Sequence, residues 1–208
     1  MKQNKNNIHI FTGDLPSDLN FTDTVSIDCE AMGLNINRDR LCLVQIADTT
    51  GCLYVIKFNA DNFDAPNLCK LLENSSILKI FHFARFDVSL MYKYLGAMTQ
   101  NIYCTKIASK IARTYTDAHG LKDLCRDLLG ITLNKAQQSS DWGNEHLSDE
   151  QIKYAVGDVL HLLDLKKALD IILYRENRAQ LAHGCFQVLQ HRVLLDVMGW
   201  ENIDIFAH

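Results

Sequence analysis

The sequence predicts one α/β domain, in which a mixed β-sheet is flanked by helices and most of the helices come from the second half of the chain. Three observations predict this class. Apolar runs of strand type, alternating or nearly continuous, cover residues 24–29, 41–47 and 52–58. The helical period dominates after Gly96. No repeat or low-complexity tract divides the 208 residues, a length in the range of one domain.

The order of the first elements follows from the residues that interrupt these runs. Polar segments that contain glycine, at 33–39 and 48–51, suit the turns between the three strands. A fourth strand is expected over 77–83. It leads directly into a helix over 84–95, which Gly96 ends.

Helices are expected over most of the remaining chain. They are predicted near residues 105–113, 121–129, 148–176 and 178–189. The helix over 148–176 has a capping-box start, because Ser148 is followed three residues later by Gln151.

Composition limits the partners and the compartment. With 21 Lys and Arg against 25 Asp and Glu, the net charge of −4 gives no general attraction to nucleic acid, so a polyanion must be bound locally, by a few basic residues or by cations. No stretch approaches the roughly 20 apolar residues of a membrane span, and the polar start has no signal-peptide core. Seven scattered cysteines are typical of free thiols. We therefore expect a cytoplasmic protein that does not bind membranes.

Carboxylates in three separate segments are the candidates for chemistry. Asp28 and Glu30 are two residues apart on a strand, so their side chains share one face, while Cys29 points to the other. Asp87 falls in the first turn of the helix after the fourth strand, near the sheet end. Taken alone, the strand acids fit an ordinary solvated face, and Asp87 fits a favourable position at a helix N-terminus.

The third segment lies on the helix predicted over 148–176. Tyr154 and Asp158 are separated by about 40° around the helix axis, and His161 belongs to the same polar face. This face is either solvated or directed into a site. Metal-dependent phosphodiester hydrolysis needs several carboxylates to converge where cations can bridge them. The sequence therefore raises the question of whether the three segments meet.

The three segments resemble the three motifs of the DEDD 3′→5′ exonucleases. The matching residues are Asp28-x-Glu30 with Gly33-Leu34, the run from His82 to Asp87, and Tyr154-x-x-x-Asp158. The tyrosine is typical of the subclass that includes ribonuclease D, and the segments 119–124 and 140–142 are similar to that family as well. The resemblance implies a ribonuclease H-like (DnaQ-like exonuclease) fold, a mixed β-sheet flanked by α-helices.

Within this superfamily the chain is similar to the nano-ribonuclease C group. The similar segments are 13–16, 38–42, 103–109, 113–117 and 199–208. The group lacks the helical C-terminal nucleic-acid-binding (HRDC) domains of full ribonuclease D, so the resemblance implies a single 3′-5′ exonuclease domain over residues 1–208. It also implies a homo-oligomer, an octameric ring, that degrades short single-stranded RNA, dinucleotides especially.

The resemblance assigns a role to each candidate. Asp28 would bridge two divalent cations, Mg²⁺ or Mn²⁺, Glu30 and Asp158 would complete one cation site, and Asp87 would hold the other mainly through water. Tyr154 would orient the attacking water. These five residues are the predicted catalytic set, and the four acids are the predicted metal ligands.

Gly33, Leu34 and His82 are the predicted substrate-binding residues, with Leu34 as a wedge between the last two bases. The first motif departs from the family at Cys29, where Thr is usual, and at Ala31. Because Ala31 removes a possible hydroxyl near the substrate, substrate positioning follows from the motif less directly than metal binding.

Other signals leave alternatives open. Lys106, Lys110 and Arg113 lie on one helical stripe, which is either a phosphate-contacting ridge or a solvated face. Trp142 either stacks on a base or anchors the packing of its loop. The apolar C-terminal residues, 186–195 and 203–206, either pack onto the domain or form a subunit interface.

The combined prediction is a divalent-metal-dependent 3′-5′ exoribonuclease that hydrolyses short oligoribonucleotides to nucleoside 5′-monophosphates. The first alternative is ribonuclease D-like trimming of tRNA or other structured RNA 3′ ends. Remoter alternatives are an inactive RNA-binding module and a purely structural ring subunit. A contact to the ribose 2′-hydroxyl, which would favour RNA over DNA, is not visible in residue spacing.

Overall fold

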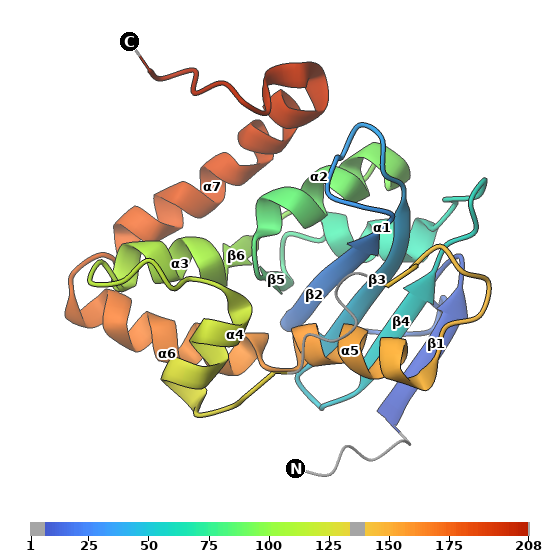
Figure 1. Cartoon of the computed structure of the whole chain (residues 1–208), viewed down its shortest axis with the longest axis horizontal. Helices are drawn as coiled ribbons and strands as arrows, with labels where there is room; N and C mark the ends of the chain where they lie inside the picture. Colours follow the sequence, from blue (N-terminus) through green and yellow to red (C-terminus); the bar gives the residue numbers. More distant parts are fainter. Residues whose placement is uncertain (1–6, 134–139, 208) are drawn as a thin grey trace.

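A six-stranded mixed sheet forms the centre of the computed structural model, which describes residues 7–133 and 140–207 (Figure 1). The strand order is β1-β4-β3-β2-β5-β6. The strands are β1 (Ile8–Thr12), β2 (Thr24–Ala31), β3 (Leu41–Asp48), β4 (Leu53–Lys57), β5 (Leu78–Phe81) and β6 (Ile102–Cys104). β3 runs antiparallel to β2 and β4, whereas β1 with β4, β2 with β5, and β5 with β6 are parallel pairs. The mixed sheet confirms the predicted fold class.

Helices cover both faces of this sheet. They are α1 (Pro66–Glu73), α2 (Ala84–Leu95), α3 (Thr105–Ala112), α4 (Leu121–Leu124), α5 (Asp149–Leu160), α6 (Leu162–Arg175) and α7 (Ala179–Leu195). Wider π-helical turns extend α4 over Cys125–Leu129 and α7 over Asp196–Trp200. Because both faces are covered, the central strand β3 is buried over Leu41–Ala47, which explains its continuous apolar sequence.

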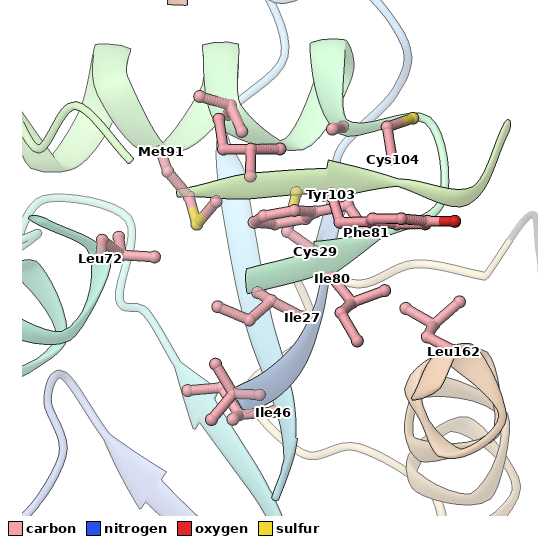
Figure 2. Packing of buried hydrophobic residues seen from close by; sticks show 14 of the residues in the cluster. Ile27, Cys29, Ile46, Leu72, Ile80, Phe81, Met91, Tyr103, Cys104 and Leu162 are labelled. Carbon is pink, nitrogen blue, oxygen red and sulfur yellow. The ribbon is translucent and has the colours of Figure 1, made fainter. Parts of the chain in front are cut away.

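Two apolar clusters lie on the two sides of the sheet. The larger contains Ile27, Ile46 and Ile80 from three neighbouring strands, together with Leu72 and Leu162 from the helices (Figure 2). The smaller joins side chains from the other face of β3 and β4 to buried residues of α5. The second cluster matters most for the site, because it fixes α5 across β2 and β3.

The helix predicted over 148–176 is wrong, since the chain forms two helices there. α5 begins at the predicted capping box, in which the Ser148 side chain accepts from the Gln151 N–H and the Gln151 side chain accepts from the Ser148 N–H. The helix ends at His161, whose backbone angles are φ −105° and ψ 0°. α6 follows directly and packs against α3.

The prediction did not include β1, α1 and β6. β1 is a half-exposed edge strand, α1 has only 8 residues, and β6 has 3, so none of them carries a long periodic pattern. The predicted helix over 84–95 is confirmed as α2, with Gly96 at φ 72° as its C-terminal cap. Within the described ranges, none of the helices has the length and the apolar character that a bilayer span requires. The polar start over residues 1–6 and the last residue of the C-terminal motif, His208, lie outside these ranges.

Candidate active site

β2 and α5 bring three of the four candidate acids together. Asp28 and Glu30 project from the face of β2 that α5 covers, and Asp158 projects from α5 toward them. One carboxylate oxygen from each of the three residues can be chosen so that all lie within 4.8 Å of one another. Segments separated by more than a hundred residues of sequence therefore meet at one point of the sheet.

Asp87 comes from the first turn of α2 and lies 2% exposed in the wall of the same cavity. Its Oδ1 accepts two hydrogen bonds from Cys29, one from the backbone N–H at 3.2 Å and one from Sγ at 3.1 Å. It does not join the triple of close oxygens formed by the other three acids. The cavity has a volume of about 600 Å³ and is also lined by Tyr154.

Burial and mutual repulsion raise the pKa of these carboxyl groups. For Asp28 the pKa lies well above its ordinary value, because the group is buried and the charges of Asp87, Glu30 and Asp158 surround it. Burial and then the charges of Asp158 and Asp87 raise the pKa of Glu30 to about 9. Burial also raises the pKa of Asp87 to about 7, although the hydrogen bonds from Cys29 oppose the shift. The cluster therefore requires protons or a cation to neutralise it.

The donor set suits a divalent cation. Mg²⁺ and Mn²⁺ prefer carboxylate and water oxygens, and the close triple supplies carboxylate oxygens from three side chains. A cation bound by these oxygens would remove the repulsion among the buried acids. The residues present therefore fit the metal that the sequence predicts.

Tyr154 lies half-buried beside the acids. Burial, followed by the charge of Asp158, raises the pKa of its hydroxyl, which also shares a hydrogen bond with Asp158. The phenol therefore keeps its proton at neutral pH and can donate it in a hydrogen bond. On its other side the ring packs on Trp142, with 5.9 Å between ring centroids. Trp142 is 2% exposed, which fits the prediction of a packing anchor better than that of an open stacking platform.

The loop after β2 carries Leu34, whose side chain is 87% exposed at the edge of the cavity. Gly33 is required next to it, because a Cβ there would overlap the carboxylate of Asp39. That buried carboxylate accepts from the backbone N–H of Asn35 and from the Arg38 side chain, so it braces the loop. Gly33 thus allows the turn that presents Leu34.

His82 also lines the cavity, and a hydrogen bond fixes its ring. Its Nδ1 lies 2.9 Å from the Thr105 hydroxyl, which donates to the backbone oxygen of Phe81. Because that hydroxyl has given its proton to Phe81, it accepts from Nδ1, which places the imidazole proton on this nitrogen. The three predicted substrate-binding residues therefore line one cavity with the acids.

Both interpretations of the basic stripe, a phosphate-contacting ridge and a solvated face, are wrong for Arg113. This side chain is 2% exposed. It donates to Asp127 at 2.6 Å and to the backbone oxygen of Ala118 at 2.9 Å, so it joins α3 to the segments that follow it. Lys110 is exposed, and Lys106 lines the cavity of the acids. His161, placed on the polar face by its spacing, is the C-cap of α5 and does not line that cavity.

Comparison with known proteins identifies the family. Residues 12–173 match the family model described as 3′-5′ exonuclease, a segment that contains the four acids and Tyr154. The chain belongs to the 3′-5′ exonuclease family. Ribonuclease D of Granulibacter bethesdensis is 32% identical over 154 residues, which are 74% of this chain and 38% of that protein. The chain spans less than half the length of the curated ribonuclease D relatives that it matches.

Solved structures of this family share the whole fold. Brucella melitensis NrnC is 50% identical, with a TM-score of 0.94 over 98% of this chain and 99% of that chain. The same protein with bound Mg²⁺ is 49% identical, with a TM-score of 0.92 over 97% and 98% of the two chains. Escherichia coli RNase D, 22% identical, has a TM-score of 0.72 over 82% of this chain and 44% of that chain, which shows the fold alone. The predicted relation to ribonuclease D and nano-ribonuclease C is confirmed.

Two features of the site were not predicted from the sequence. The bond from the Cys29 thiol to Asp87 joins residues 58 positions apart, and no local pattern indicates it. Gln45 on β3 lies directly opposite Asp28 on β2, is fully buried, and both polar atoms of its amide have no partner in the described part of the chain. A polar residue inside the apolar run 41–47 was the available signal for Gln45.

Cys29 is expected to support metal binding through Asp87. Replacing it by alanine removes the thiol donor to Oδ1, and loss of such a supporting hydrogen bond weakens metal binding by about tenfold. Cys29→Ser keeps a donor and should remain closer to the unchanged protein. The Mn²⁺ concentration that gives half of the thermal stabilisation measures this effect. Equal Mn²⁺ dependence in Cys29→Ala and the unchanged protein would contradict the role.

Stabilisation by metal is expected to grow with pH. Because the folded-state pKa values of Glu30 and Asp87 are raised, the metal-free folded chain holds protons that the unfolded chain has lost, and its stability falls as pH rises from about 4 toward 9. A cation competes with these protons. Excess Mg²⁺ should raise the midpoint temperature of thermal unfolding, relative to a sample with a chelator. This increase should be larger at about pH 8.5 than at about pH 6. A difference that shrinks with pH would oppose this account.

Proposed function

We propose that the protein is a divalent-metal-dependent 3′-5′ exoribonuclease that hydrolyses short oligoribonucleotides, dinucleotides especially, to nucleoside 5′-monophosphates. The observation that carries the proposal is the convergence of Asp28, Glu30 and Asp158 beside Tyr154 in one cavity. The similarity to NrnC supports it, since that protein has been solved with Mg²⁺ and bound to pGG at 49% and 50% identity to this chain. One domain would carry the whole activity.

The proposed ligand set holds two cations. The charges of the other three acids all raise the pKa of Asp28, and this residue would be shared between the two ions. Glu30 and Asp158 would complete one ion site. Asp87 stands apart from the close triple and would hold the second ion mainly through water. When bound, such ions activate a water and stabilise the leaving oxygen.

The other residues of the cavity position the substrate. Tyr154 would orient the attacking water through its hydroxyl, which burial keeps protonated. Leu34 would insert between the last two bases, since its side chain is exposed at the cavity edge and apolar. His82 would face the substrate from a ring fixed by Thr105. These groups would bind the substrate and orient the attacking water, while the acids would hold the cations that the reaction requires.

Trimming of structured RNA 3′ ends remains the second candidate, because the curated relatives are named ribonuclease D. An inactive RNA-binding module is disfavoured, since all four acids and Tyr154 are present and three of the acids converge. A homo-oligomer is also proposed. Large apolar side chains that are exposed on α7 and on the residues after it support an interface there; they are Leu181, Val188, Met198, Ile203, Ile205 and Phe206.

A time course on 5′-labelled RNAs of graded length tests the proposed function. With Mg²⁺ or Mn²⁺ we expect release of nucleoside 5′-monophosphates, faster from dinucleotides than from a structured 3′ end. Asp28→Asn and Asp158→Asn should lower the rate by at least about a hundredfold, because each removes a cation ligand. Native mass measured on the same samples tests the oligomer.

Asp164→Asn is the matched control for these acids. This exposed carboxylate lies on α6, pairs with Lys167 and does not line the cavity, so its loss should leave the rate unchanged. Normal turnover by folded Asp28→Asn would remove the basis of the proposal. A clear preference for the structured RNA would replace the dinucleotide substrate by the ribonuclease D-like one.

A further inference from the structure

Phe83 adopts a backbone conformation that its side chain disfavours. It is the N-cap of α2 with φ 69° and ψ 43°, in the left-handed region. The other described non-glycine residues with positive φ are Asn101 and Asn177, a residue type that tolerates this region. A bulky aromatic residue at such a position is therefore unusual, and strain of this kind concentrates at functional sites.

Neither capping nor burial explains the choice of phenylalanine. The side chain makes no capping hydrogen bond to α2, and it is 44% exposed. Asn or Gly would satisfy the backbone with less strain, and Asn would add a capping oxygen. The ring must therefore serve something outside the packing of this helix.

The exposed ring lies in the wall of the acidic cavity. Phe83 lines that cavity together with Leu34, and both also line the cavity next to it. The two come from different segments, the loop after β2 and the start of α2. Apolar groups from two sides thus border the space beside the acids.

Lys106 lies over the Phe83 ring. Its Nζ is 4.1 Å from the ring centroid, a cation–π contact that covers one face of the ring. Among the described residues that line the acidic cavity, Lys106 is the only Lys or Arg. The pair therefore places an aromatic surface and a positive charge together in a cavity that is otherwise acidic.

We propose that Phe83 is a base-stacking residue of the active site, and that Lys106 fixes its ring and adds a positive charge for the substrate phosphates. The inference rests on the proposed function and specifies how the nucleotide is held. Single-stranded nucleic acids are bound by aromatic rings that stack on bases and by cations along the backbone. Every base has a π-face, so the platform accepts all four bases.

Two Phe83 variants separate stacking from the backbone strain. Phe83→Asn removes the ring and suits the left-handed conformation, so the protein should fold at least as stably as before. We expect KM for a 5′-phosphorylated diribonucleotide to rise about tenfold, with a smaller change in kcat, because one stacked base contributes about that much affinity. Phe83→Tyr retains the ring and should recover most of the loss.

A dinucleotide with abasic sugars in place of its nucleosides completes the test. It has no base to stack, so Phe83→Asn should change its KM far less than that of the ordinary dinucleotide. An equal rise in KM on both substrates would overturn the inference. So would a KM of Phe83→Asn for the ordinary dinucleotide equal to that of the protein without the substitution, provided that the latter hydrolyses this dinucleotide. If the unchanged protein hydrolyses no RNA of any length, the proposed function fails and the inference fails with it.

Discussion

Repulsion among closely spaced carboxylates is the constraint on which the rest of this structure depends. Asp28, Glu30 and Asp158 present oxygens within 4.8 Å of one another in a partly buried cavity, where charges interact more strongly than in water. Apolar packing supplies the opposing force, because Val156 and Val159 of α5 join the apolar cluster of β3 and β4 on the face that these acids share. The fold thus holds the negative charges together until a cation neutralises them.

This constraint also explains how an acidic protein is suited to a polyanion. The net charge is −4, and Lys106 is the single Lys or Arg among the described residues that line the acidic cavity. Cations held by the acids would convert a repelling site into an attracting one. Base recognition then has to come from apolar surfaces, and the large apolar side chains exposed there include Leu34, Phe83 and Met32.

Local periodicity placed two pairs of candidate residues on shared faces, and the resemblance to the DEDD exonucleases predicted that they belong to one site. A two-residue spacing on a strand placed Asp28 and Glu30 on one face, and a four-residue spacing on a helix aligned Tyr154 with Asp158. The failures depend on distant contacts. The helix break at His161 accompanies the packing of α6 on α3, and Arg113 left its predicted surface stripe because Asp127, 14 residues away, binds its guanidinium. The left-handed conformation of Phe83 likewise has no signature in residue type.

The number of metal ions that each chain binds tests the central claim most directly. Titration of the metal-free protein with Mn²⁺, with free Mn²⁺ followed by electron paramagnetic resonance, counts them. The account predicts two ions per chain, and a loss of tight binding in Asp28→Asn that is folded as judged by circular dichroism. A folded native chain that binds no Mn²⁺, or an Asp28→Asn chain that binds as many ions as tightly, would contradict it.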